Sequence, residues 1–201
     1  MVHISKGSGK MEGINSINTN SLTIPFCIKM SECKELVCSK CYARRLLKYR
    51  ASLTNKLELN NELLSSRFLK DSELPIINAL YFRFNSFGEL INDTHLINLI
   101  MIVNRNPNTI FGLWSKRVDL IRATLDKIPS NLVLIYSNPK INDWNDPFPP
   151  TPFDKIFSVY NKKDVKIRKS DMFINCGGRK CLECLQCYEK NGTKKIREGL
   201  K

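Results

Sequence analysis

Residues 79–114 read ALYFRFNSFGELINDTHLINLIMIVNRNPNTIFGLW, and this stretch decides the fold that the sequence predicts. Its two ends, residues 79–84 and 109–114, are short runs rich in aromatic and aliphatic side chains, which is typical of buried strands. Between them, residues 94–104 have apolar side chains at helical spacing. A strand, a helix and a second strand at this spacing predict a parallel βαβ unit.

The same pattern continues toward both ends of the chain. Residues 118–128 predict a second amphipathic helix, and residues 132–136 and 155–160 predict two more strands. On the N-terminal side, helices are predicted over residues 41–50 and 57–70. We therefore expect a single α/β domain over residues 1–201. It is either a partial (β/α) barrel or an open parallel sheet, with cysteine-rich metal-binding loops near its N- and C-terminal ends.

The apolar pattern speaks against a membrane protein. Apolar residues make up 42% of the chain. The longest apolar run, residues 96–103, is interrupted by Asn98 and is far shorter than the roughly 20 residues of a membrane span. No apolar secretory segment follows Met1. We expect a cytoplasmic protein with no membrane partner, whose eight cysteines are metal ligands or catalytic thiols rather than disulfides.

The cysteines form two sets, separated by the cysteine-free residues 42–175. The first set, spaced x5, x4 and x2, is Cys27, Cys33, Cys38 and Cys41. The second set, spaced x4, x2 and x2, is Cys176, Cys181, Cys184 and Cys187. Neither set has the two CxxC knuckles of a usual zinc site, and the second is similar to a ferredoxin cluster loop. We expect two [4Fe–4S] clusters, with zinc as the alternative; the spacing leaves open that the sets exchange a ligand.

Polar side chains follow the predicted strands at the points where the strands end. Ligands of parallel α/β sheets bind at the carboxyl ends of the strands, so we expect these side chains to share one rim. The candidates for catalysis are Arg83, Glu89 and Lys116. The candidates for holding a cofactor or substrate are Asn85, Ser86, Ser115 and Asn138. Gly88 is expected to adopt a turn conformation that other residues avoid.

The chain is basic, with a formal net charge of +13. Lys and Arg are frequent in residues 162–169 and 190–201, and we expect residues 188–201 to be a mobile basic tail. Nucleic acid is a partner consistent with this charge. The basic residues do not interleave with a repeated aromatic motif, however. A small-molecule substrate or an electron-transfer partner is therefore the favoured interpretation.

Several segments resemble one known family. They are Lys10-Met11, Ile14-Asn-Ser-Ile-Asn-Thr19, Cys38-Ser-Lys-Cys41-Tyr-Ala43, Arg83-Phe-Asn-Ser-Phe-Gly-Glu89, Trp114-Ser-Lys116 and the second cysteine set. The chain is similar in them to tailed-phage proteins of the gene-product-eighty-eight type. The resemblance runs from about Lys10 to Cys187. It implies a phage origin, and hence the cytoplasm of the host cell, but it implies no particular activity.

A more remote resemblance is to radical S-adenosylmethionine enzymes, which hold a cluster on three cysteines next to a full or partial (β/α) barrel. Here Cys33, Cys38 and Cys41 are spaced x4 and x2 instead of x3 and x2, and Cys27 offers a fourth thiolate. The favoured hypothesis is thus a phage iron–sulfur protein that transfers electrons or reduces a small molecule. A radical enzyme, and a non-enzymatic zinc or cluster protein that binds nucleic acid, are the alternatives.

Overall fold

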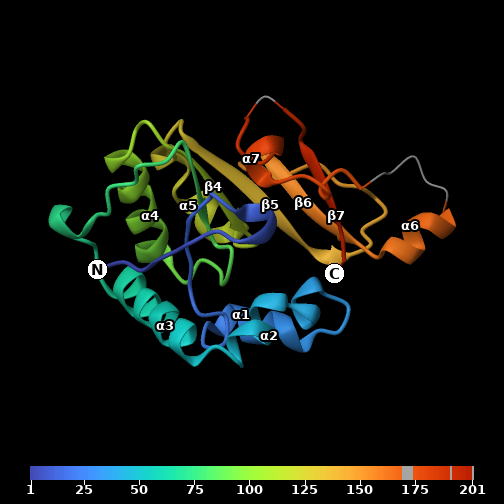
Figure 1. Ribbon diagram of the computed structural model, residues 1–201, viewed down its shortest axis with the longest axis horizontal. Coiled ribbons are helices and arrows are strands. Elements are labelled where there is room, and N and C mark those ends of the chain that lie inside the picture. Colours follow the sequence, from blue (N-terminus) through green and yellow to red (C-terminus); the bar gives the residue numbers. More distant parts are fainter. Residues whose placement is uncertain (169–173, 191, 201) are drawn as a thin grey trace.

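A seven-stranded sheet forms the centre of the computed structural model, which describes residues 1–168, 174–190 and 192–200 (Figure 1). The strands are β1 (Ile4–Ser5), β2 (Ser16–Ile17), β3 (Tyr81–Phe84), β4 (Ile110–Ser115), β5 (Leu132–Ile141), β6 (Lys155–Tyr160) and β7 (Lys195–Gly199). Their order in the sheet is their order in the chain. β1 is antiparallel to β2, and each later neighbouring pair is parallel. The predicted open, mostly parallel α/β sheet is therefore confirmed, and the described residues do not close it into a barrel.

Helices occupy most of the connections between the parallel strands. The connection from β2 to β3 contains α1 (Pro25–Glu32), the 3₁₀ helix η2 (Val37–Lys40), α2 (Tyr42–Leu47), α3 (Ala51–Ser66) and the 3₁₀ helix η3 (Asp71–Glu73). The later connections contain α4 (Asp93–Arg105), α5 (Val118–Ala123), the 3₁₀ helix η4 (Leu125–Lys127), α6 (Lys162–Arg168) and α7 (Cys181–Cys184). A further 3₁₀ helix, η1 (Gly9–Met11), lies between β1 and β2. A membrane-spanning segment is absent from the described residues, because each of their helices is too short or too polar for one.

One face of the sheet is covered by α3, α4 and α5. Side chains alternate between the two faces along a strand, so Phe82 and Phe84 of β3 share this face. Phe84 stacks on Phe111 of β4 with the ring centroids 5.2 Å apart. Leu64 of α3 and Leu99 of α4 pack into the same core. Burial of apolar surface stabilises a protein by roughly 25 cal/mol per Å², so this core is a main source of the fold's stability.

The opposite face is covered by the N-terminal segment and by residues 176–187, which we call the second cysteine loop. Trp114 of β4 forms a core on this side with Ile14 and Tyr188. Gly112 permits the close approach: an added Cβ would lie 2.7 Å from the Trp114 ring and 3.2 Å from the Tyr188 ring. The second cysteine loop is therefore packed on the sheet directly.

The segment with the first cysteine set lies at the carboxyl ends of the strands. Figure 1 shows α1 and α2 on the side toward which the arrowhead of β5 points. The Tyr42 hydroxyl of α2 donates a hydrogen bond to the carbonyl of Ser86 just after β3 (2.7 Å). The Tyr42 ring also meets Phe87 edge-on, with centroids 5.7 Å apart. The first cysteine set is thus attached just beyond the end of β3, and the second set is attached to a face of the sheet.

Local chemistry explains where the helices and turns of the scaffold begin and end. Asn92 caps α4, because its side chain accepts a hydrogen bond from the backbone N–H of His95 (2.9 Å). The helix predicted over residues 118–128 is shorter, since α5 stops before Thr124 and the chain continues as η4. The Thr124 hydroxyl donates back to the Leu120 carbonyl (3.2 Å), a bond that weakens a regular helix. Gly88 has a φ of +82°, as its predicted turn requires.

The prediction of a mobile tail over residues 188–201 is wrong for residues 195–199. These residues form β7, which pairs with β6, and Ile196 is only 1% exposed. The Asp146 carboxylate accepts hydrogen bonds from Lys195 (2.9 Å) and Arg197 (2.7 Å). Part of the positive charge of this segment is therefore neutralised within the fold. Three members of the predicted basic stretches lie outside the described residues: Lys169, Asn191 and Lys201.

Candidate functional site

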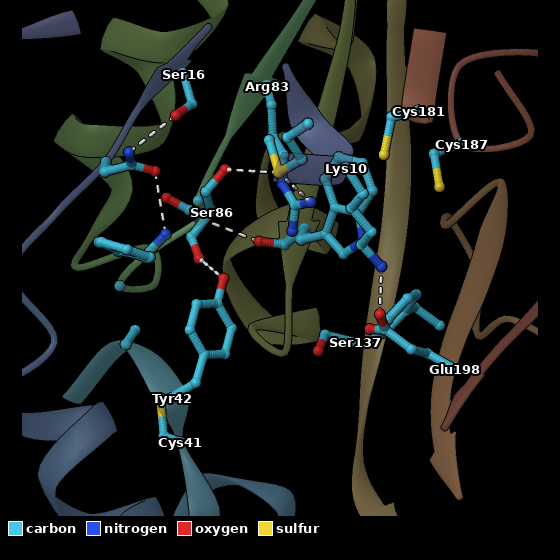
Figure 2. A pocket seen from close by; sticks show the side chains of 18 of the residues that line it. Lys10, Ser16, Cys41, Tyr42, Arg83, Ser86, Ser137, Cys181, Cys187 and Glu198 are labelled. Atoms are coloured by element: carbon cyan, nitrogen blue, oxygen red, sulfur yellow. Dashed lines mark hydrogen bonds and ion pairs between the residues drawn. The ribbon is translucent and has the colours of Figure 1, made fainter. Parts of the chain in front are cut away.

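A cavity of about 1020 Å³ brings the two cysteine sets together (Figure 2). Seven of the eight cysteines line it: Cys27, Cys38, Cys41, Cys176, Cys181, Cys184 and Cys187. Cys33 is exposed and is not part of the lining. Five of the seven polar residues predicted from the strand ends also line the cavity: Arg83, Asn85, Ser86, Glu89 and Lys116. Most of the candidates predicted from the carboxyl ends of the strands therefore line the same cavity as the cysteines.

The first cysteine set is held by short consecutive helices. Cys27 lies in α1, whose first residue is Pro25, and Pro suits the first helical turn. Cys38 lies in η2, and the backbone N–H of Cys41 donates to the carbonyl of Cys38 (3.2 Å). Burial raises the pKa of both Cys27 and Cys38, and the nearby charge of Cys41 raises it further. These thiols therefore form one electrostatically coupled group.

Lys116 is a cation close to this group. Burial acts to lower the pKa of Lys116, but the neighbouring charges of Cys38 and Glu89 outweigh it, and the pKa is raised. Its Nζ donates a hydrogen bond to the Ser137 hydroxyl (3.0 Å). The positive charge in turn acts to lower the pKa of Cys27 and Cys38, against the effect of burial. Lys116 therefore favours the thiolate forms that bind metal.

Glu89 fixes the position of Lys116. The Glu89 side chain is almost fully buried, and its carboxylate accepts hydrogen bonds from the Ser115 hydroxyl (2.6 Å) and the Lys116 backbone N–H (2.9 Å). It also accepts a hydrogen bond from the backbone N–H of Leu90 (2.9 Å). Ser115 is itself outside the cavity lining, so its role here is to hold Glu89. Asn138 of β5 is outside the lining too, and its side-chain amide donates a hydrogen bond to the Asp143 carboxylate (3.0 Å).

The second cysteine set is fixed by packing and by β7. Cys176 forms an isolated parallel bridge with Glu198 of β7. Tyr188 packs on Tyr81 and on Trp114, with ring centroids 5.3 Å and 6.1 Å apart. Burial raises the pKa of Cys187 to about 12, although the charge of Arg83 opposes this shift. This set is therefore also a group of half-buried thiols with a cation beside it.

Two cations, Lys10 and Arg83, lie near the second set. The Lys10 ammonium forms an ion pair with the Glu198 carboxylate and lies 3.5 Å from the Cys176 Sγ. The Arg83 guanidinium lies over the Trp114 ring, with Cζ 3.8 Å from the ring centroid. Figure 2 shows Arg83 and Lys10 between Cys41 and the pair Cys181 and Cys187. Both cations line the cavity.

Sequence reasoning missed four of the residues that shape this site: Lys10, Met11, Tyr42 and Glu198. Lys10, Met11 and Tyr42 stand in the segments that resemble the phage family, and that resemblance was the available signal. Glu198 had no signal, because it was placed in the mobile tail. It reaches the cavity only because residues 195–199 join the sheet as β7.

The donor chemistry of the two sets fits an iron–sulfur cluster. The first set offers three thiols at the cavity and the second offers four, and each set has cations near it that favour thiolates. Within the described ranges, no three Cys, His, Asp or Glu side chains are arranged to hold a single metal ion. The predicted metal-binding role of the two cysteine loops therefore remains a prediction.

Comparison with known proteins identifies the family of the chain. The family model described as Gene product 88 matches residues 3–199. No curated protein and no solved structure matches the chain. The remote resemblance to radical S-adenosylmethionine enzymes thus receives no support.

Proposed function

The chain belongs to the phage Gene product 88 family, and on that premise we propose that it is an iron–sulfur protein with two [4Fe–4S] clusters that reduces, or passes electrons to, a small molecule in the cavity. One observation carries the proposal. Seven cysteines, drawn from segments far apart in the sequence, line a single cavity. A buried cysteine without a ligand usually serves as a small hydrophobic residue, and that role does not require two groups of thiols around one cavity.

The residues beside the two sets support thiolate ligation. Lys116 stands next to the first set, and Lys10 and Arg83 stand next to the second. Positive charge and hydrogen-bond donors near a thiolate stabilise it and raise the reduction potential of a cluster that it holds. When bound, an iron–sulfur cluster supplies one-electron transfer. The charges of Lys116, Lys10 and Arg83 would help to set the reduction potential at which that transfer occurs.

The relative placement of the sets supports chemistry within the cavity. Cys41 lies on one side of it and Cys181 and Cys187 on another (Figure 2). A small molecule between them would be within reach of both sets. The reducing cytoplasm of the host is the compartment that such a function requires, since exposed thiols are oxidised elsewhere.

Anaerobic purification tests the proposal directly. We expect a brown protein with iron and acid-labile sulfide, and an electron paramagnetic resonance signal after reduction. Cys38→Ser and Cys184→Ser should each lower the iron per chain by about half, because each removes one ligand from a different cluster. Ser39→Ala, a change next to Cys38 at a hydroxyl that bonds only to backbone carbonyls, is the matched control and should leave the iron unchanged. A colourless protein that holds two zinc ions would refute the proposal.

A further inference from the structure

The cavity has a strongly positive lining. Among the described residues, nine Lys and Arg side chains line it: Lys6, Lys10, Lys40, Arg44, Arg45, Arg50, Arg83, Lys116 and Arg179. Only two carboxylates, Glu89 and Glu198, do so. Glu89 is occupied by three hydrogen bonds from its own corner of the fold, and Glu198 is paired with Lys10. Even with two clusters of net charge about −2 each, the lining would remain positive.

Arg83 is a partly buried cation of this lining whose charge no carboxylate of the described residues pairs with. It takes part in none of the ion pairs formed among the described residues. A guanidinium has five N–H donors, yet within the described part of the chain Arg83 makes one hydrogen bond, to the Met11 thioether (3.4 Å). Its Nε is buried without a partner. The Trp114 ring offsets part of the charge through its π face, but it supplies no acceptor in the plane of the guanidinium.

Met11 occupies the position where an acceptor would be useful. The Met11 Sδ lies 3.4 Å from an Arg83 nitrogen and 3.8 Å from the Ser86 hydroxyl. A thioether is a weak acceptor on an unbranched, adaptable side chain. A ligand oxygen in its place would gain stronger hydrogen bonds from Arg83 and Ser86 without breaking an ion pair. The planar fork of a guanidinium matches the paired oxygens of a carboxylate or a phosphate.

We propose that the cavity binds an anionic small molecule, and that Arg83 holds its carboxylate or phosphate group with Ser86 beside it. As a statement of the substrate class, this inference rests on the proposed function. The binding itself depends only on the cavity and its cations. Lys10 and Lys116 line the same cavity, and their charges increase the local concentration of anions.

Isothermal titration calorimetry on the full chain tests the inference, with inorganic phosphate and succinate as separate probes at constant ionic strength. We expect wild type to bind at least one probe, and the tighter one identifies the group that the site prefers. Arg83→Gln should weaken binding tenfold or more, because it removes a charged bidentate donor. Arg83→Lys keeps the charge without the fork and should weaken binding less. Arg122→Gln, on α5 and outside the lining, is the matched control and should bind as wild type does.

Iron content, measured on the same samples, separates the two proposals. Loss of anion binding in Arg83→Gln with unchanged iron supports the anion site. Absence of binding in iron-loaded wild type overturns the anion site and leaves the iron–sulfur proposal intact. Unchanged binding in Arg83→Lys and Arg83→Gln also overturns it, because the anion would then lie elsewhere. If Arg83→Gln does not fold, as circular dichroism would show, the comparison of wild type with Arg83→Lys decides.

Discussion

Replacing Glu89 by alanine should destabilise the corner that carries Lys116. The Glu89 side chain is 3% exposed and accepts hydrogen bonds from the backbone N–H groups of Leu90 and Lys116, both at 2.9 Å. The Ser115 hydroxyl, the third donor, can rotate toward another acceptor. The two backbone donors cannot turn away, because they belong to fixed positions of the main chain.

The size of the effect follows from those two donors. Each buried donor left without an acceptor costs about 1–3 kcal/mol, so Glu89→Ala should lower the free energy of unfolding by about 4 kcal/mol. Glu89→Gln keeps one carbonyl oxygen but loses the charge and the second acceptor. We expect it to cost about 2 kcal/mol, since hydrogen bonds to charged groups are the stronger kind.

Urea unfolding followed by far-ultraviolet circular dichroism measures these differences. Glu62→Gln is the matched control, because the Glu62 side chain is exposed on α3. This variant should unfold at the same urea concentration as wild type. A loss below about 1 kcal/mol for Glu89→Ala would mean that its partners are not buried donors. The reasoning about this corner, and the positioning of Lys116 by Glu89, would then be refuted.

Three further outcomes are expected. Cys33→Ser should leave the iron per chain unchanged because Cys33 is exposed and outside the cavity lining, whereas Cys38→Ser removes about half; equal losses would show that Cys33 is a ligand. Burial lowers the pKa of His95 in the folded protein to about 3. In the unfolded chain the same imidazole has its ordinary pKa of about 6.5, so as the pH falls the unfolded chain takes up this proton before the folded protein does. The free energy of unfolding should therefore fall as pH is lowered from about 6.5 toward 3, and a pH series on His95→Gln should show a flatter slope; equal slopes would contradict this. Gly112→Ala places a Cβ 2.7 Å from the Trp114 ring and should lower stability by about 1–3 kcal/mol, with a changed near-ultraviolet circular dichroism spectrum; an unchanged spectrum and stability would show that the ring has room.

The scaffold could be predicted from the sequence because its strands are marked locally. β3, β4 and β6 are short runs that are mostly apolar, and the helix between β3 and β4 has a regular stripe of apolar residues. Only the first half of β5, residues 132–136, is such a run, so the sequence predicts a shorter strand than the ten residues of β5. β1 and β2 have two residues each, too few for any pattern. The sequence of β7, Lys-Ile-Arg-Glu-Gly, is mostly charged and is therefore interpreted as part of a basic tail; only Ile196 and Gly199 of this strand are buried. What makes it a strand is its pairing with β6, which no local pattern reports.

The candidate site could be predicted only as far as one rule reaches. The carboxyl ends of parallel strands share an edge, and this brings Arg83, Glu89 and Lys116 to the cavity. Lys10 and Glu198 are far apart in the sequence and meet only in the fold. The same rule cannot tell a side chain that lines the cavity from one that supports the lining, as Ser115 shows.

The order of the strands has a consequence for how the protein is made. Each strand from β4 onward pairs with the strand synthesised just before it, so the growing chain can add these strands one at a time as it leaves the ribosome. Cys27 to Cys41 emerge first, before the strands that will support them. The second cysteine loop emerges after β6 and can settle on a sheet that already exists. The two thiol sets therefore emerge at different times, and the cavity lining is complete only after the second cysteine loop and β7 have joined the sheet.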